Sequence, residues 1–301
     1  MTALVSRKQA LVGLAGAAGA VIAAGAGGYE LVEHDVLPGK HYLEQLTGAC
    51  SVAVPPQHFG PLGMLVSGRF YSHARHREVG YAIGYPHVYL PNRPPPLVIC
   101  LHGHGGSHRS FDVQRLAALL LGGVPAVRAA FVAVDGGDGY WNRHPGDDPM
   151  SMVIDELIPR CRLLGLGRGQ KRIGLYGYSM GGYGALLLAE KRPDLVGAVA
   201  VISPALWLSY QEAHAADPTA YASKQAFEAN DILRHRGRLR GIPIRLATGF
   251  DDPFYSDVQV VASKLPAGTV SVFSKGCHTG GFPAAQVAPS LAFLGRYLGR
   301  G

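Results

Sequence analysis

Cysteine is scarce in this sequence, with four residues among 301 and no C-x-x-C pair. That spacing argues against a zinc-ribbon site and against a thioredoxin-like redox motif. Cys100 lies in an apolar run, so we expect a buried thiol there. In an exported protein, Cys50, Cys100, Cys161 and Cys277 would allow three disulfide connectivities, and the sequence does not choose among them.

Internal repeats, coiled-coil heptads, zinc fingers and the aromatic-basic motifs of RNA-binding proteins are also absent from the sequence. The formal net charge is +7, a basic balance found in proteins that bind nucleic acids or anionic membranes. Here the arginines are scattered, and the one modest cluster comprises Arg234, Arg236, Arg238 and Arg240. A solvated basic surface explains this pattern best. We therefore expect no nucleic-acid partner, and weak peripheral attraction to an anionic membrane or envelope stays open.

One long run without charge occupies residues 9–29, directly after Arg7 and Lys8. A short positive region followed by an apolar core is the layout of an export signal. The run is mainly alanine and glycine, so it would enter lipid weakly. The stretch SRKQAL at residues 6–11 is similar to a twin-arginine signal, with Lys8 in place of one arginine.

We expect residues 1–30 to be an export signal that is cleaved, which would place the protein in the cell envelope or outside the cell. An uncleaved N-terminal membrane anchor is an alternative, because the run is about as long as a membrane span. An apolar helix of a cytosolic protein is the third interpretation. Residues 31–63 are expected to connect this leader to one catalytic domain at residues 64–300.

The rest of the chain alternates short apolar runs with helical patterns. The expected strands are residues 64–72, 78–86, 96–103, 129–136, 171–177, 197–204, 242–249 and 269–273. The expected helices are residues 111–121, 150–165 (with Pro159 as a kink), 181–193 and 284–298. Buried strands that alternate with helices predict an α/β fold, a mainly parallel sheet flanked by helices. Residues 206–241 are too many for a simple crossover and are expected to form a small helical insertion over the active site.

A serine between glycines stands at one of these strand–helix junctions, in the stretch Gly177-Tyr178-Ser179-Met180-Gly181. This is the context that a G-x-S-x-G nucleophile elbow requires. Such a serine sits on a sharp, strained turn, and a side chain on either flanking glycine would collide with neighbouring backbone. We therefore predict that Ser179 is a nucleophile, with a structural turn serine as the alternative.

A nucleophilic serine needs a base to take its proton. In this kind of fold the chain order is serine, acid, histidine. His278 follows the last expected strand, whereas His214 and His235 lie in the polar insertion. We therefore predict His278 as the base.

The acid is predicted in the segment GFDDPF, just past the preceding strand. Asp251 and Asp252 compete for this role. Adjacent side chains on a loop point in different directions, so one should reach His278 and the other should cap the turn. We favour Asp252 because it directly precedes the rigid Pro253.

An acyl-transfer site also needs two donors for the developing oxyanion. One is expected to be the backbone N–H of Met180, next to the nucleophile, and the other the backbone N–H of His104 in the segment LHGHGGSH. His102, His104 and His108 also raise the possibility of a metal site. Because only the buried-looking Cys100 accompanies them, we expect neither a metal nor a cofactor.

The segment GYSMGGYGALLLA resembles the esterase D family of α/β-hydrolases, which includes S-formylglutathione hydrolases, feruloyl-type esterases and mycolyltransferases. The similarity covers about residues 96–278. The resemblance implies an α/β-hydrolase fold, a triad of Ser179, Asp252 and His278, and an oxyanion hole from the amides of Met180 and His104. It also implies that residues 135–148 border the substrate pocket. Tyr140, Trp141 and Asn142 would line that pocket, or pack as a structural aromatic group with a solvated acidic tail.

Two positions depart from the family. Its members often carry a polar residue and then tryptophan after the base, where this chain has Thr279 and, further on, Phe282. Mycolyltransferases often have alanine or serine where Gly181 stands. The second departure favours an ordinary esterase.

We therefore predict a serine hydrolase that forms an acyl-enzyme with a small-molecule or lipid ester. Two alternatives remain. One is an acyltransferase that moves the acyl group to a sugar or lipid hydroxyl, and the other is a non-catalytic envelope protein that binds lipid or glycan.

Overall fold

The computed structural model describes residues 50–90, 92–169 and 172–298. The expected export segment, residues 1–30, lies outside them, as do residues 31–49 of the expected connection and the last residues of the expected catalytic domain. Within the described ranges, no helix is both long enough and apolar enough to cross a membrane.

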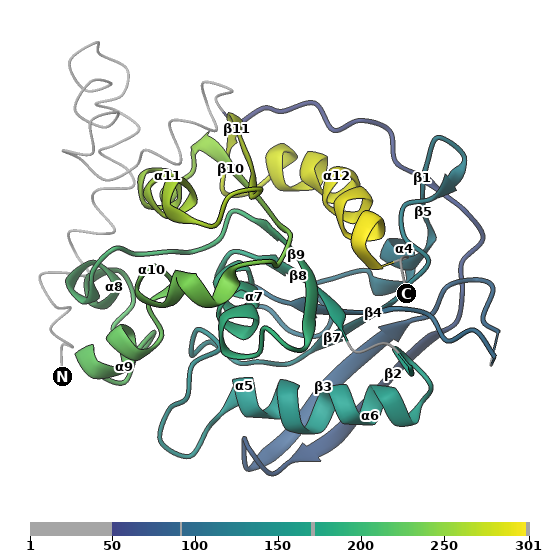
Figure 1. Ribbon diagram of the computed structural model, residues 1–301, viewed down its shortest axis with the longest axis horizontal. Coiled ribbons are helices and arrows are strands. Elements are labelled where there is room, and N and C mark those ends of the chain that lie inside the picture. Colours follow the sequence, from purple (N-terminus) through teal and green to yellow (C-terminus); the bar gives the residue numbers. More distant parts are fainter. Residues whose placement is uncertain (1–49, 91, 170–171, 299–301) are drawn as a thin grey trace, which may run out of the picture.

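Eight strands of the described chain form one sheet in the order β11-β10-β9-β8-β4-β7-β3-β2 (Figure 1). Their bounds are β2 Leu65–Ser72, β3 Arg77–Gly84, β4 Leu97–Leu101, β7 Ala130–Val134, β8 Ile173–Tyr178, β9 Val196–Ile202, β10 Ile244–Asp251 and β11 Val270–Cys277. The strands from β11 to β7 are parallel, and β3 and β2 continue the sheet antiparallel at one edge. The predicted mainly parallel sheet is confirmed.

The central strands are buried on both faces. Every residue of β4 is buried, and its side chains alternate between two cores. Leu97, Ile99 and Leu101 face one core, whereas Val98 and Cys100 face the other. This is why these strands read as continuous apolar runs in the sequence. The expected burial of Cys100 is also confirmed.

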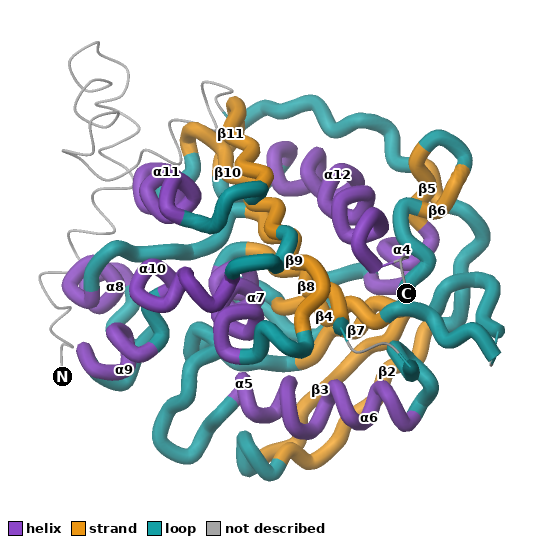
Figure 2. Tube along the Cα trace, in the orientation of Figure 1, coloured by secondary structure: helices purple, strands orange, loops and turns teal. Residues whose placement is uncertain are grey.

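Helices cover both faces of the sheet (Figure 2). The first core is closed by α7 (Met180–Lys191), by α11 (Tyr255–Lys264) and by the helical segment 149–163. The second core is closed by α4 (Val113–Ala118) and by α12 (Gly281–Leu298). The result is a three-layer α/β domain.

The helix expected at residues 111–121 is shorter than predicted. It ends at Ala118, and β5 (Leu119–Leu121) then pairs with β6 (Val124–Pro125) and with β1 (His58–Phe59). Gly122 and Gly123 between β5 and β6 have φ of 58° and 85°. Two successive positive φ values form a tight hairpin turn, which glycine adopts readily. A right-handed helix needs negative φ, so it cannot continue through these residues.

The helix expected at residues 150–165 is present but irregular. It runs from α5 (Pro149–Ser151) through a π-helical segment (Met152–Leu157) into α6 (Ile158–Leu163). Pro159 lies in the first turn of α6 and cannot donate a backbone hydrogen bond to the preceding turn. The wider π-helical winding therefore lies in the turn directly before Pro159, where the sequence predicts a kink.

The helical insertion between β9 and β10 is confirmed. It contains α8 (Tyr210–Ala216), α9 (Lys224–Ala229), α10 (Ile232–His235) and the 3-10 helix Arg236–Leu239. The insertion is fixed to α7, because the Tyr183 hydroxyl donates to the carbonyl oxygen of Asn230 over 3.0 Å.

A segment that we call the strap, residues 50–59, passes over α12 and ends in β1 (Figure 1). A disulfide joins Cys50 at its start to Cys277 at the end of β11. The sequence leaves three ways to pair the four cysteines. The structure forms the Cys50–Cys277 bond, and Cys100 and Cys161 are free and buried.

Candidate active site

Ser179 occupies the turn between β8 and α7 with φ of 55° and ψ of −124°. A positive φ is uncommon for a residue with a side chain and marks a strained backbone. A Cβ on Gly177 would overlap the carbonyl oxygen of Gly181, and a Cβ on Gly181 would overlap that of Leu101. The steric reason predicted for both glycines is therefore confirmed.

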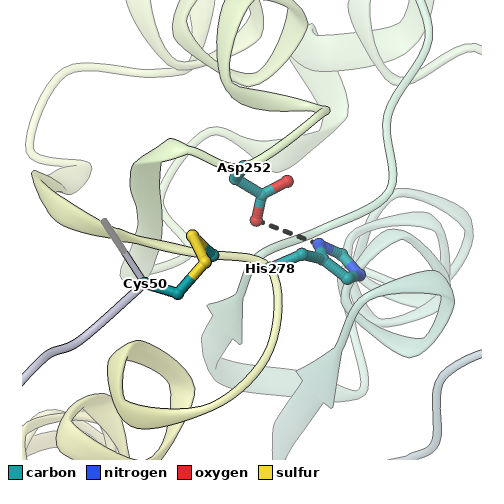
Figure 3. The surroundings of a disulfide bond; sticks show 4 residues. Cys50, Asp252 and His278 are labelled. Carbon is teal, nitrogen blue, oxygen red and sulfur yellow. Dashed lines mark hydrogen bonds and ion pairs between the residues drawn. A yellow bond between two sulfur atoms is a disulfide. The ribbon is translucent and has the colours of Figure 1, made fainter. Parts of the chain in front are cut away.

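The structure brings Ser179, His278 and Asp252 together. Nε2 of His278 lies 2.9 Å from Oγ of Ser179, and Nδ1 of His278 lies 3.0 Å from Oδ2 of Asp252 (Figure 3 shows the second bond). Ser179 is 8% exposed and Asp252 is 4% exposed. The three side chains thus form a hydrogen-bonded chain that is largely shielded from water.

Asp252 both reaches His278 and caps the turn, two roles that the sequence analysis assigned to different aspartates. Its Oδ2 meets His278, and its Oδ1 accepts the backbone N–H of Phe254 over 2.9 Å. Asp251 instead ends β10, opposite Cys277. An aspartate can accept from the backbone two residues on, so one side chain both closes the turn and reaches the histidine.

Close packing at the ends of β10 and β11 sets the distance between Asp252 and His278. The pairing of the two strands is irregular between Gly249 and Asp251. A Cβ on Gly249 would overlap the carbonyl oxygen of Gly276, and Gly276 has φ of 141°. Glycines at these two positions let the strand ends approach closely.

Both residues predicted to donate to an oxyanion lie in segments that flank Ser179. Met180 is the first residue of α7, so its N–H has no acceptor within the helix. The loop with His104 packs against the serine, since a Cβ on Gly103 would stand 3.1 Å from Cβ of Ser179. The N–H of Gly105 donates to Oδ1 of Asp138 over 2.6 Å and anchors this loop.

The three histidines of this loop point to different partners. Nε2 of His102 accepts a hydrogen bond from the N–H of Gly136 at 2.9 Å, and Nδ1 of His102 donates to the carbonyl oxygen of Gly103. Burial lowers the pKa of His102, which favours this neutral form. His108 pairs with Asp135, and His104 lies 3.6 Å from Asp217. Across the described residues, no group of three or more His, Cys, Asp or Glu is arranged to hold a metal ion.

Tyr140, Trp141 and Asn142 differ in their surroundings. Trp141 is fully buried, and its Nε1 donates to the carbonyl oxygen of His102 over 3.3 Å. Asn142 is 1% exposed and donates to the carbonyl oxygen of Ala220. Trp141 and Asn142 are therefore packed beneath the loop, which corresponds to the packed alternative rather than to a pocket lining. The Trp141 ring fills space that the absent side chains of two glycines leave open.

Tyr140 belongs to a series of rings beside the serine that the sequence analysis did not identify. We call Tyr140, Trp207 and Phe254 the aromatic row. Ring centroids are 6.5 Å apart from His104 to Tyr140, 4.8 Å from Tyr140 to Trp207, 5.6 Å from Trp207 to Phe254 and 5.4 Å from Phe254 to His278. The row therefore connects the His104 loop to His278. Trp207 lies in the insertion, where no sequence motif marks it.

Tyr178 is a second residue that the sequence analysis missed. Its hydroxyl donates to the carbonyl oxygen of His278 over 2.6 Å, and its ring centroid lies 5.4 Å from that of the imidazole. Burial and the nearby Asp252 carboxylate raise the pKa of Tyr178 to about 12, so the hydroxyl stays protonated and able to donate. The only available sequence signal was its place directly before Ser179.

Comparison with known proteins identifies the family and the fold. The family model described as "Putative esterase" matches residues 72–264, more than half of the chain. An S-formylglutathione hydrolase from Agrobacterium tumefaciens is 17% identical, with 82% of this chain and 100% of that chain covered at a TM-score of 0.64. A ferulic acid esterase is 16% identical, with 80% and 100% covered at 0.62. No curated protein matches the chain in sequence.

Sheet order, flanking helices and these structural neighbours define the class as the α/β-hydrolase fold. Within that class, the chain belongs to the esterase family whose model it matches, as the resemblance in its sequence predicted. It is thus a serine esterase, an enzyme that hydrolyses carboxylic esters.

Proposed function

We propose that the enzyme hydrolyses small-molecule carboxylic esters through an acyl-enzyme on Ser179. Oγ of Ser179 attacks the ester carbonyl carbon while its proton passes to Nε2 of His278. The tetrahedral intermediate collapses, and the alcohol leaves with that proton. Water then attacks the acyl carbon, gives a proton to His278, and Ser179 is restored as the carboxylic acid departs.

The observation that carries this proposal is the hydrogen-bonded chain from Ser179 through His278 to Asp252. Oδ2 of Asp252 accepts a hydrogen bond from Nδ1–H of His278, which leaves Nε2 free to act as the base. His278 becomes positively charged during the attack. Because Ser179 and Asp252 are largely shielded from water, the attraction between this charge and the Asp252 carboxylate is weakly screened.

The oxyanion of the intermediate would be bound by the backbone N–H groups of Met180 and His104. The first stands at the N-terminus of α7, a 12-residue helix whose dipole also favours negative charge there. The second belongs to the loop that packs against Ser179 through Gly103. Neither donor needs a metal or a cofactor.

The aromatic row indicates which esters fit. Trp207 and Phe254 are half-buried, and the row connects the His104 loop to His278. Flat apolar groups pack well against such rings. We therefore propose that one side of the ester carries an aromatic or compact apolar group. One neighbour of the same fold is a ferulic acid esterase from Anaeromyces mucronatus solved in complex with ferulic acid.

Export is a further part of the proposal. Disulfides persist mainly in oxidising compartments, and the Cys50–Cys277 bond would survive best outside the cytosol. The charge-free run at residues 9–29 supports the same conclusion. Mass analysis of the protein recovered outside the cytoplasm should give a mature N-terminus near residue 30, and an intact Met1 on cytosolic protein would contradict export.

Labelling with a fluorophosphonate probe tests the catalytic proposal. Wild-type protein should be labelled at Ser179 and should release acid from an aryl ester, whereas Ser179→Ala should do neither. Product analysis with a sugar acceptor present should show free acid rather than a transferred acyl group. Serine-independent hydrolysis, or transfer as the main outcome, would refute the proposal.

A further inference from the structure

His278 stands on a segment that is flexible by its composition. Residues 276–281 contain three glycines, and Gly276 and Gly280 have φ of 141° and 78°. Glycine lets the backbone take many conformations that other residues avoid. Yet the imidazole must keep two hydrogen bonds, at 2.9 Å to Ser179 and 3.0 Å to Asp252. Something outside the segment must restrict it.

Cys277, directly before His278, carries a covalent restraint. It is fully buried, and its sulfur is bonded to Cys50, 227 residues earlier in the chain. Figure 3 shows the disulfide beside the His278–Asp252 pair. A bond at the neighbouring residue fixes the backbone from which the His278 side chain projects.

The restraint is effective because the strap is itself fixed at its other end. Nε2 of Gln57 donates to the carbonyl oxygen of Ala284 in α12 over 3.1 Å. β1 pairs with β5, and the N–H of Gly60 donates to the carbonyl oxygen of Ala118 over 2.7 Å. Val52 is partly buried and packs against the second core. The disulfide therefore ties the histidine segment to α12 and to the end of α4.

Noncovalent contacts hold His278 itself from other directions, and on the side of the strap the backbone of Val52 packs closely against Gly281. Tyr178 holds its carbonyl oxygen, and Asp252 holds Nδ1. Phe254 contacts the ring. All three lie on β8 or on the loop after β10, so none of them links the segment to the strap.

We propose that the Cys50–Cys277 disulfide is a positioning element for His278, so that breaking it slows the chemical step while substrate binding is retained. The proposal rests on the proposed role of His278 as the base. A displacement of a catalytic group by about 1 Å can cost on the order of 100-fold in rate. We expect a loss of about 10-fold or more in kcat, because Tyr178 and Asp252 still restrain part of the motion.

The test variant is Cys50→Ser, which removes the bond and leaves Cys277 in place. Gln57→Ala weakens the anchor at the other end of the strap and keeps the disulfide, so it reports how much of the restraint depends on that anchor. Cys161→Ser controls for loss of a cysteine elsewhere in the core. For each protein, kcat, KM, the rate constant of fluorophosphonate labelling and the labelled fraction at completion are measured. The last value corrects for misfolded protein.

Reduction of folded wild-type protein gives a second arm that does not depend on refolding of a variant. A phosphine converts the disulfide to two thiols and becomes the phosphine oxide, with its oxygen from water. Initial rates are taken while circular dichroism still shows the native fold. Burial raises the pKa of Cys161 to about 12 and raises that of Cys100 further. An alkylating reagent that traps the two released thiols should therefore leave Cys161 and Cys100 unmodified during the assay.

The expected result is a lower kcat and a slower labelling rate per active site in Cys50→Ser and in reduced wild type, with KM within about 2-fold. Cys161→Ser should keep wild-type kcat, and Gln57→Ala should lower kcat less than Cys50→Ser does. An unchanged kcat per labelled site in Cys50→Ser would overturn the inference, as would a change confined to KM. Wild-type protein that is never labelled at Ser179 would overturn the proposed function, and this inference with it.

Discussion

The hydroxyl of Tyr178 donates to the backbone carbonyl oxygen of His278 over 2.6 Å, although 100 residues separate them in the chain. Tyr178 is the residue directly before the serine nucleophile of the proposed mechanism. The same short turn therefore presents Ser179 and holds the main chain of its base. This contact couples the ends of β8 and β11.

Tyr178→Phe removes that donor and keeps the ring. We expect kcat to fall by about 10-fold with little change in KM, because the lost bond loosens His278 rather than the substrate. The free energy of unfolding should fall by about 1 kcal/mol, the scale of one hydrogen bond. Tyr176→Phe, two residues earlier on the same strand, is the control. Equal kinetics in both variants would show that the contact has no positioning role.

Asp252→Asn and Asp251→Asn form a matched pair. Asparagine at position 252 cannot hold the charge of the His278 imidazolium and favours the wrong tautomer, so we expect kcat to fall by about 10²- to 10⁴-fold. Asp251 ends β10 opposite Cys277, and the carboxylate bonded to His278 belongs to Asp252, so the Asp251 variant should stay within about 3-fold of wild type. Steady-state kinetics on an aryl ester measure both. If Asp251→Asn lost more activity than Asp252→Asn, the assignment of Asp252 as the acid would be wrong.

Trp207→Ala tests the role of the aromatic row. Loss of this ring should raise KM for an aryl or cinnamoyl ester by about 10-fold, which corresponds to about 1.4 kcal/mol of ring contact. KM for a short acetate ester should change by less than about 2-fold, since a methyl group offers little area. Leu208→Ala, at an exposed neighbour, is the control. Equal effects on both esters would show that the row does not select the substrate.

Glu190 predicts a pH dependence of stability. This residue of α7 is 1% exposed and forms a 3.6 Å ion pair with the exposed Arg238, while its Oε2 has no hydrogen-bond partner among the residues that the structure describes. Burial raises the pKa of Glu190 above the usual carboxyl value. The folded state therefore holds this proton more tightly than the unfolded state. The contribution of the protonated Glu190 to stability is complete below the pKa that this carboxyl has in the unfolded chain. It declines as the pH rises through the pKa that the carboxyl has in the folded protein.

Glu190→Gln keeps the shape and removes the titration. We expect the variant to be more stable than wild type at pH 7 by about 1 kcal/mol, with the difference shrinking toward pH 4. Urea unfolding followed at several pH values measures this. Glu228→Gln, at a half-exposed glutamate in α9, should show no such trend. A variant that is less stable at pH 7 would mean that Arg238 compensates the buried charge fully.

Much of the site is encoded locally in the sequence. The glycines around Ser179 are needed because their neighbours leave no room for a Cβ, and that constraint is written into five consecutive residues. Asp252 follows the mostly buried β10 and His278 follows β11, which is buried only at its end, and parallel strands deliver their carboxyl ends to one edge. Local steric rules and the periodicity of burial are enough to predict the fold class and these three residues.

Other features depend on which distant segments meet. The pairing of Cys50 with Cys277, the contact of Tyr178 with the His278 carbonyl and the burial of Trp141 all join residues far apart in the chain. The order of strands and the path of the strap over α12 decide these contacts. Sequence patterns carry burial and turn geometry but not partner identity, so the tertiary structure alone determined what holds the histidine in place.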